Sequence, residues 1–393
     1  MVGVPVQPEP LAYLDHAATT PLRAEARAAM LPWLGEAFGN PSGAHGVARA
    51  ARQAIDEARD TIAGVLGCAP NEVVFTGGGT EADNLAVLGV VAARPGPVVA
   101  SAIEHHAVLE PVAEVGGRLA PVDERGIVDL SALATLLEEH PDTTLVSVMT
   151  ANNEVGSVQP LAEIAKVVRR RAPEAVLHTD AVQGAAWLDI ATVAADAQLV
   201  SVSAHKVGGP QGVGVLIHRR GTPLQARQLG GGQERELRSG THNVAGIVGM
   251  AAALAVNLDR RDEEWPRVAA LRDRLAAGLI AALPGTTVNG DEAHKLINNC
   301  HVTFPGVESE SLLLLLDREG LCAAAGSSCA SGAMDLSHVL AAMGMPRDRA
   351  RASLRLTFGW SSTDAEVDEA LAVIPAAVTQ LRPLAARRLA AGS

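Results

Sequence analysis

Short apolar runs alternate with amphipathic stretches through the first half of the chain. Runs rich in β-branched residues predict strands, whereas Ala, Leu, Glu and Arg at helical spacing predict the helices between them. The expected strands are EVVFTGGG, GPVVASAIEHH, TTLVSVMTANNE, AVLHTDAVQ and QLVSVSAHK, and two expected helices are TEADNLAVLGVVAA and PLAEIAKVVRRRA. From about Asn71 to Gly214, this alternation predicts an α/β domain with a mostly parallel sheet that carries helices on both faces.

Each of these apolar runs ends in a polar cluster. The clusters are TGGGTE, EHH, ANNE, HTDAVQ and SAHK. Because the carboxyl ends of parallel strands lie along one edge of a sheet, and ligands of such folds bind beyond that edge, we expect the five clusters to converge. The pattern therefore predicts a single binding site.

The second half of the chain has a different pattern. A long helical stretch from Val244 to Leu283 leads to mixed helical and strand segments. We expect a large domain at 1–259 and a smaller α+β domain at 260–393, and leave open whether the first ~15 residues pack with the smaller domain. The segment GLCAAAGSSCASGAMD has no apolar period, so we predict a mobile loop there.

Composition narrows the class of protein. The 393 residues carry a formal net charge of -12, which disfavours binding to nucleic acid or to an anionic membrane. No signal peptide or membrane-spanning run is recognisable. The four cysteines, Cys68, Cys300, Cys322 and Cys329, form no CxxC pair, so we expect no metal site and a reducing, cytoplasmic location.

The glycine turn in FTGGGTEADNLA allows two interpretations. Glycines followed by a helix that begins near Gly79 and Thr80 could hold a phosphate on free backbone N–H groups. An ordinary tight turn explains the same letters, because the segment matches neither a Walker motif nor GxGxxG.

Asp180 and Lys206 each follow an apolar strand pattern. Asp180 is either a helix cap or a buried carboxylate for a cationic ring nitrogen, as pyridoxal phosphate requires. Lys206 is either a strand-end charge that reaches water or a desolvated amine with a lowered pKa, suited to form a Schiff base. Their closeness along the chain favours the second interpretation of both.

Cys329 lies among Gly, Ser and Ala in GSSCASG. A lone cysteine is commonly a small buried apolar residue, but these neighbours offer little to pack and much freedom to move. We therefore expect a nucleophile at Cys329 and structural roles for Cys68, Cys300 and Cys322.

Nine motifs resemble one family in their order. They are YLDHAATTP, GNPSGAHG, FTGGGTEADNLA, EHHAVL, ANNEVGSVQP, HTDAVQG, SAHKVGGPQGVG, GGGQERELRSGT and GSSCASG, and SLRLTFGWSSTDAEVDEAL extends the match. They are similar to the cysteine desulfurases of the NifS/IscS type, which are pyridoxal-phosphate enzymes of fold type I in the class V aminotransferase group. The resemblance implies a large domain with a sheet of the seven-stranded type.

The resemblance also implies roles for single residues around pyridoxal 5'-phosphate. Lys206 would bind the cofactor as a Schiff base, Asp180 would pair with the pyridine nitrogen, and His105 would stack on the ring. Further residues would contact the cofactor's phenolic oxygen (Gln183), its phosphate (Gly79, Thr80, Ser203, His205 and, from a partner subunit, Thr241) and the substrate carboxylate (Asn153 and Arg355).

The implied reaction converts L-cysteine to L-alanine. Lys206 moves the Cα proton, His105 serves as a proton shuttle, and Cys329 takes the sulfur as a persulfide. The persulfide passes to an acceptor such as an iron–sulfur scaffold or a thiolation protein, and the Thr241 contact implies a homodimer.

Departures from the family pattern are few. His16 replaces a common asparagine, Gln211 a common lysine and Trp360 a frequent arginine, and none of these removes a catalytic group. A selenocysteine lyase and a cysteine-sulfinate desulfinase are the alternative activities. A non-catalytic scaffold with the same fold is a more distant alternative.

Overall fold

The computed structural model describes residues 12–325 and 336–391. Its main sheet has seven strands in the order β2-β8-β7-β6-β5-β3-β4, and all of them run parallel except β8. The predicted α/β fold with a mostly parallel sheet is confirmed. The strands are β2 (Val73–Thr76), β3 (Val98–Ser101), β4 (Arg118–Ala120), β5 (Leu145–Ser147), β6 (Val176–Asp180), β7 (Leu199–Ser203) and β8 (Gly214–His218).

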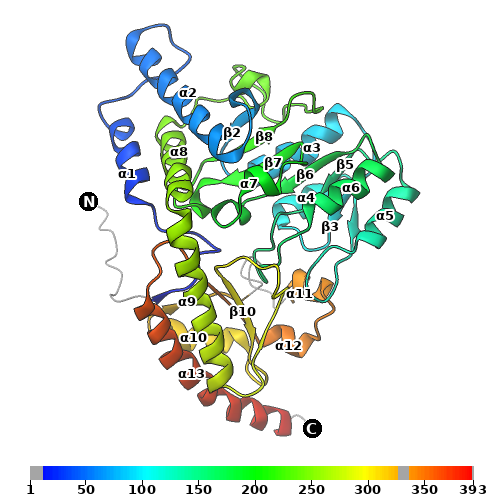
Figure 1. The fold of residues 1–393 in the computed structure, drawn as a ribbon, viewed down its shortest axis with the longest axis vertical. Coiled ribbons are helices and arrows are strands. Elements are labelled where there is room, and N and C mark those ends of the chain that lie inside the picture. Colours follow the sequence, from blue (N-terminus) through cyan, green and yellow to red (C-terminus); the bar gives the residue numbers. More distant parts are fainter. Residues whose placement is uncertain (1–11, 326–335, 392–393) are drawn as a thin grey trace.

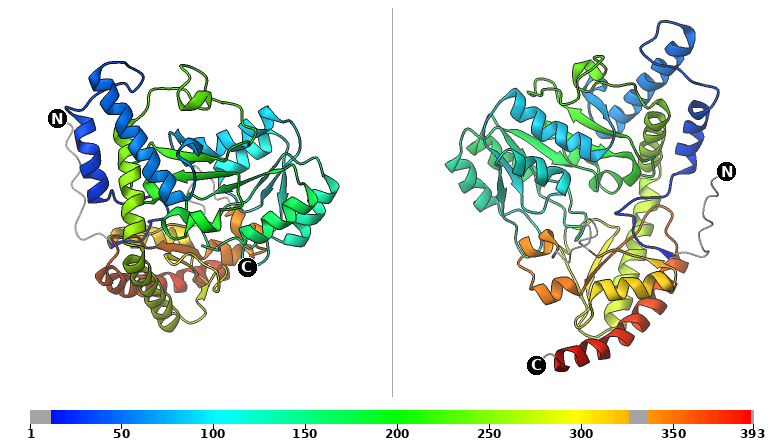
Figure 2. Two further views of the ribbon diagram at one scale, coloured as in Figure 1. Left: turned by 45° about the horizontal axis from the view of Figure 1, so that its top comes forward. Right: turned by 180° about the vertical axis from the view of Figure 1, so that it is seen from behind.

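Helices cover both faces of this sheet (Figures 1 and 2). The α-helices between residues 24 and 259 are α1 (Ala24–Met30), α2 (Gly46–Leu66), α3 (Gly79–Ala93), α4 (His106–Glu114), α5 (Leu130–Glu139), α6 (Leu161–Arg171), α7 (Ile190–Val193) and α8 (Val244–Asp259). Short 3-10 helices are η1 (Leu31–Leu34), η2 (Pro70–Glu72), η3 (Gly184–Ala186), η4 (Ala204–Lys206) and η5 (Glu234–Glu236).

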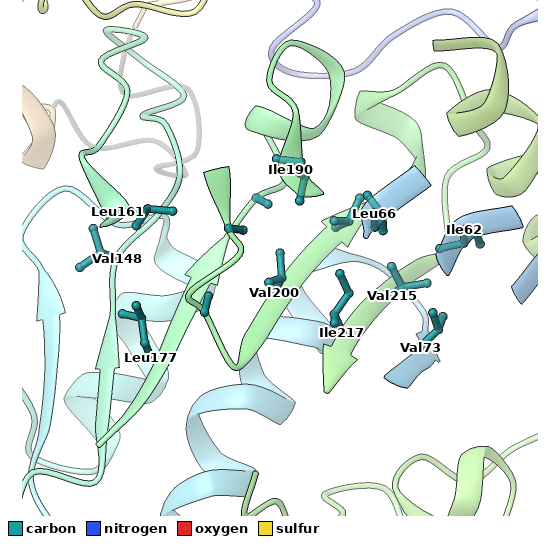
Figure 3. Close-up of a cluster of buried hydrophobic side chains, with 14 of the residues drawn as sticks. Ile62, Leu66, Val73, Val148, Leu161, Leu177, Ile190, Val200, Val215 and Ile217 are labelled. Carbon is teal, nitrogen blue, oxygen red and sulfur yellow. The ribbon is translucent and has the colours of Figure 1, made fainter. Parts of the chain in front are cut away.

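The strand residues alternate between two apolar layers, because successive side chains of a strand point to opposite faces. Val200, Val215 and Ile217 lie on the face covered by α2, α6 and α8, where they join the buried cluster of Figure 3. Leu199 and Leu216 point to the opposite face, which α3 and α4 cover. Burial on both faces explains why these strands are apolar over most of their length.

The second core lies around a smaller antiparallel sheet of order β12-β10-β9. A short parallel pair, β1 with β11, brings residues 12–13 to the same region, and the side chain of Leu14 belongs to this core. The elements are β1 (Ala12–Tyr13), α9 (Arg261–Ala282), β9 (Thr287–Val288), β10 (Asn299–Thr303), α10 (Ser309–Arg318), β11 (Leu321–Cys322), α11 (His338–Ala342), α12 (Arg347–Arg351), β12 (Ser353–Thr357) and α13 (Asp364–Ala391).

The long helical stretch expected at Val244 to Leu283 consists of two helices. The chain leaves helical geometry at Arg260, where φ is -94° and ψ is 4°, so that α8 packs on α2 and α9 packs on α13. The domain boundary at 259/260 stays a prediction. Within the described part of the chain, no helix is both long and apolar enough to cross a membrane.

Candidate active site

A cavity of about 390 Å³ lies at the carboxyl ends of β6 and β7. The five polar clusters of the sequence do converge, since each of them supplies at least one lining residue. Its lining residues are Ala17, Ala18, Gly79, Thr80, Asp83, His105, Met149, Ala151, Asn153, Asp180, Val182, Gln183, Ser203, His205, Lys206 and Arg355.

Lys206 ends the short helix η4 that directly follows β7. Its Nζ donates hydrogen bonds to the carbonyl oxygens of Ala17 at 2.5 Å and Ala18 at 2.7 Å. The buried valines of β7 fix the strand in the core, and the turn after it directs the lysine into the cavity rather than into solvent. The lowered pKa that the sequence led us to expect for the Lys206 amine stays a prediction.

Asp180 is the last residue of β6 and is buried. Burial raises the pKa of its carboxyl to about 6, while the N–H of Val182, at 2.8 Å from Oδ1, and the positive charge of Lys206 oppose that rise. An aspartate that accepts a backbone N–H two residues ahead can cap a turn, so the cap interpretation and the cofactor interpretation both fit this contact. Its place in the cavity wall is what distinguishes it from a solvated cap.

The glycine turn forms the start of α3. Gly78, the N-cap residue, has a φ of 150°, a backbone conformation that residues other than glycine rarely adopt. A Cβ on Gly79 would lie 2.7 Å from Cγ2 of Val182, so glycine allows this close approach to the turn after β6. A more open depression lined by Gly77, Thr80 and other residues adjoins the turn, and free N–H groups at the helix start favour an anion there.

Three polar side chains complete the wall around Lys206. Burial, followed by the charge of Lys206, lowers the pKa of His105 to about 4, and the same two causes lower that of His205 to about 4. Both imidazoles are therefore neutral near pH 7. Gln183 donates from Nε2 to the Ala17 carbonyl at 2.8 Å, and Nδ1 of His205 lies 3.1 Å from the Thr19 hydroxyl.

Arg355 reaches the cavity from the second core, on strand β12. Its Nη2 donates to Oδ1 of Asp15 at 2.8 Å and its Nη1 to the Asn153 carbonyl at 3.2 Å. Its Nε is buried and has no hydrogen-bond partner among the described residues. The neighbouring Asn152 fixes the turn that carries Asn153, because its Oδ1 accepts the N–H groups of Glu154 and Val155.

Two predicted site residues are absent from the described lining of this cavity. Thr241 is exposed and does not line it. Cys329 lies outside the described residues, as does most of its loop. The other three cysteines are unbridged: Cys300 is buried, while Cys68 and Cys322 are half-buried.

None of the three departures from the family pattern lines the cavity itself. His16 is buried against Gly359, with Nε2 at 3.3 Å from the Ser362 hydroxyl. Trp360 packs under the guanidinium of Arg23, 4.8 Å from its ring centroid, and Gln211 lines the open depression beside the glycine turn.

Sequence reasoning missed Asp83 and Asp15. Asp83 lies within the segment TEADN, which is expected to be helical, and a polar residue there is expected on the exposed face. In the structure Asp83 is 1% exposed and lines the cavity. The signal that could reveal it is its helical spacing, four residues after Gly79 and so one turn further along the same face. Asp15 shows no such signal, because only the tertiary fold brings it to Arg355.

Comparison with known proteins gives the family of this arrangement. The model of the class V aminotransferases matches residues 12–370. The chain belongs to this family. It is 44% identical over 385 residues to an IscS-like cysteine desulfurase of Mycobacterium tuberculosis, a match that covers 95% of this chain and 97% of that protein.

Solved structures of similar proteins superpose on this chain over most of its length. A NifS-like protein superposes with a TM-score of 0.88 at 34% identity, covering 94% of this chain and 100% of the other. A structure described as SspA in complex with cysteine superposes with a TM-score of 0.77 at 30% identity, covering 88% and 98%. The resemblance inferred from the nine motifs, and the fold it implied, are confirmed.

Class V aminotransferases use pyridoxal 5'-phosphate, and this chain takes it as its cofactor. The residues present fit that group on three observations. A lysine amine and a buried carboxylate share one cavity. Beside them lies the N-terminus of α3, where glycine lets the backbone pack closely. These groups suit an aldehyde, a pyridine nitrogen and a phosphate respectively.

Proposed function

We propose that the chain is a pyridoxal-phosphate-dependent cysteine desulfurase, which converts L-cysteine to L-alanine and transfers the sulfur to an acceptor. The observation that carries the proposal is the convergence of Lys206, Asp180 and Arg355 on one cavity from three separate elements. The curated relatives are named cysteine desulfurases, which supports this activity.

Eight residues of this chain would hold the cofactor. Lys206 is placed to bind the aldehyde, Asp180 to face the pyridine nitrogen and His105 to stack on the ring, with Gln183 at the phenolic oxygen. The phosphate would lie at the start of α3, against Gly79, Thr80, Ser203 and His205. When bound, the cofactor supplies an electron sink that stabilises negative charge at the substrate Cα.

The substrate carboxylate would bind Arg355 and Asn153. A guanidinium suits a carboxylate because its planar fork offers parallel N–H donors, and the buried Nε of Arg355 is a donor without a partner in the described chain. The Asp15 carboxylate pairs with Nη2 of the Arg355 guanidinium. The arginine is thereby oriented before the substrate arrives, which lowers the entropic cost of binding.

Two groups of the cavity would move protons. Lys206, once it is free of the cofactor, is placed to take the Cα proton. His105 has a pKa lowered to about 4, so it is neutral at pH 7 and accepts a proton rather than donating one at the start of the reaction.

Sulfur transfer is assigned to Cys329, which lies outside the described residues. A bond forms between its Sγ and the substrate sulfur while the carbon–sulfur bond breaks, and the bonding electrons stay with the carbon that becomes the methyl group of alanine. The acceptor of the persulfide is a protein of a sulfur pathway, such as an iron–sulfur scaffold or a thiolation protein. Thr241 contacts the cofactor of a second subunit in this proposal, which makes the enzyme a homodimer, and its location is cytoplasmic.

The chain's three lysines give a direct test of the cofactor assignment. Lys166, Lys206 and Lys295 are all the lysines in the sequence. Borohydride reduction of the holoenzyme followed by peptide mapping should find the cofactor on Lys206 alone. Labelling of Lys166, which is exposed, or of Lys295, in the second core region, in place of Lys206 would overturn the assignment.

Substrate choice is tested by product formation. Alanine release should be fastest with L-cysteine when the enzyme is compared on L-cysteine, L-selenocysteine and L-cysteine sulfinate. A preference for selenocysteine or sulfinate would replace the proposed activity with one of the two alternatives. The Lys206→Ala variant should lose multiple turnover on all three substrates, whereas Lys166→Ala should retain it.

A further inference from the structure

A buried polar cluster lies directly behind Asp180, in the layer between the sheet and α3. His178, two residues before Asp180 on β6, points to the same face of the sheet. Its Nδ1 lies 2.8 Å from the Ser147 hydroxyl and its Nε2 lies 3.0 Å from the Ser201 hydroxyl. Asp83 of α3 closes the cluster, with Oδ1 at 3.5 Å from Nε2 of His178.

The cluster is buried and rich in acid groups. Asp83, Asp180 and His178 are 1%, 5% and 0% exposed, and Glu104, beside them, is fully buried. Lys206 is the cation that faces Asp180, and His105 lines the same cavity as a neutral imidazole. Two or three anions buried close together are unfavourable, so the cluster must retain protons on some of its carboxyl groups.

The contacts decide which carboxyl of the Asp83–Asp180 pair carries the proton. Asp180 accepts the Val182 N–H and faces Lys206, and both favour its anionic form. Oδ1 of Asp83 accepts no hydrogen bond in the described part of the chain, although it lines the cavity. Burial and the charge of Asp180 raise the pKa of Asp83 well above its usual value, with the Ser201 hydroxyl opposing, and burial lowers that of His178 to about 3.

We propose that Asp83 is a positioning residue that keeps the proton of a buried Asp83–Asp180 pair, so that Asp180 remains the anion that faces the cavity. Asp83 then adds a polar but uncharged group beside Asp180. A polar neighbour stabilises the Asp180 carboxylate, whereas a second negative charge would drive a proton onto it. The role rests on the proposed pairing of Asp180 with the cofactor's pyridine nitrogen, because that pairing requires Asp180 to be ionised.

The first experiment does not need the cofactor. The infrared spectrum of the apoprotein at pH 7, recorded for the wild type and for Asp83→Asn, should differ by one protonated carboxylic acid band that the variant lacks. A difference that shows only the loss of a carboxylate band would overturn the proposal. Glu104 contributes equally to both spectra and cancels.

The second experiment follows the ring nitrogen in the holoenzyme. Cofactor labelled at this nitrogen should give the same NMR shift in the wild type and in Asp83→Asn, since the amide is also polar and uncharged. Asp83→Leu fills a similar volume without a polar group, so the signal should move toward the unprotonated form and kcat should fall by about tenfold to a hundredfold, with little change in KM. A silent Asp83→Leu, or an Asp83→Asn that behaves like Asp83→Leu, would contradict the proposal.

Asp180→Asn separates this inference from the proposed function. If Asp180→Asn leaves the ring-nitrogen signal unchanged, the pairing of Asp180 with the pyridine fails, whatever Asp83 does. If Asp180→Asn moves the signal and Asp83→Leu does not, the pairing holds and the role of Asp83 fails.

Discussion

Single residues at this site owe their chemistry to burial. Asp180 ends strand β6 and Lys206 ends the short helix that follows strand β7, so the sheet brings both side chains into one cavity. The sequence allowed both residues to be identified, because a charged side chain directly after a β-branched run is unusual. It did not allow Asp83 or Asp15 to be identified, because their partners are distant in sequence and only the packed fold brings them together.

His16 makes the stability of the fold sensitive to acid. Burial lowers the pKa of His16 to about 4, below the ordinary value of 6.5. The unfolded chain therefore binds a proton at a higher pH than the folded one, and stability falls as the pH drops from about 6.5 toward 4.

We expect His16→Asn to lose less stability on acidification. From pH 7 to pH 5 the wild type should lose about 2 kcal/mol more than this variant, from a shift of 1.36 kcal/mol per pKa unit. Urea unfolding at both pH values measures the difference, with His140→Asn as a control that should follow the wild type. An equal acid loss in the wild type and His16→Asn would contradict the expectation.

At the scale of elements, five strands and the layered arrangement could be predicted from the sequence, and two strands of the main sheet could not. β4 is three residues long and exposes Arg118 and Leu119, so it lacks an apolar run. β8 begins at a glycine that packs against Gly78 and is antiparallel to its neighbours, and the alternation of strands and helices gives no sign of it. The helix break at Arg260 was missed although the charged run DRRDEE, at 259–264, interrupts the apolar pattern there.

A second element-scale feature is the segment that covers the outer edge of β2. Three successive residues, Glu234, Arg235 and Glu236, have positive φ values of 47°, 56° and 66°, an unfavourable conformation for residues other than glycine. The turn places the Glu234 carboxylate on the Phe75 N–H at 2.8 Å, on Arg59 at 2.6 Å and on His242 at 2.7 Å. These contacts satisfy the free edge of the strand and fix the residue next to Thr241.

We expect Glu234→Gln to weaken this attachment. The hydrogen bonds to His242, Arg59 and Phe75 outweigh burial and lower the pKa of Glu234 to about 2, so its stabilisation is complete above about pH 4.5 and is lost as the pH falls toward 2. At pH 7 the variant should be less stable by about 2–3 kcal/mol, and the gap should shrink by about 1 kcal/mol at pH 3.5. Urea unfolding at the two pH values tests this.

The matched control is Glu163→Gln, which removes an exposed pair with Lys166 and should cost less than about 1 kcal/mol. A Glu234→Gln cost as small as that of the control, or one that does not change with pH, would contradict the account.

At the scale of the whole molecule, one buried arginine joins the N-terminal segment to the rest of the protein. Arg23 is 1% exposed and contacts Glu264 of α9 at 2.5 Å and Asn257 of α8 at 2.5 Å, and its guanidinium lies over Trp360. The same segment carries Ala17 and Ala18, whose carbonyls hold Lys206. Arg23 thus connects the two core regions and the segment that holds Lys206.

We expect Arg23→Met to destabilise the protein by about 3–5 kcal/mol, because it leaves the Glu264 carboxylate without its buried partner. Arg260→Met removes a pair with Glu25 in which both side chains are more than a third exposed, and should cost no more than about 1 kcal/mol. Denaturant unfolding of both variants measures the two losses in unfolding free energy. Equal costs would show that the buried network does not join the regions.

The central claim is sulfur transfer from L-cysteine to Cys329, and its most direct measurement is the mass of that residue after a single turnover. Incubation of the holoenzyme with one equivalent of L-cysteine, alkylation and peptide mapping should place one extra sulfur atom on Cys329, with one alanine formed per persulfide. Cys329→Ala should keep the cofactor absorbance and release no sulfide catalytically. Full turnover by Cys329→Ala, or the extra sulfur on Cys68, Cys300 or Cys322 instead, would contradict the account.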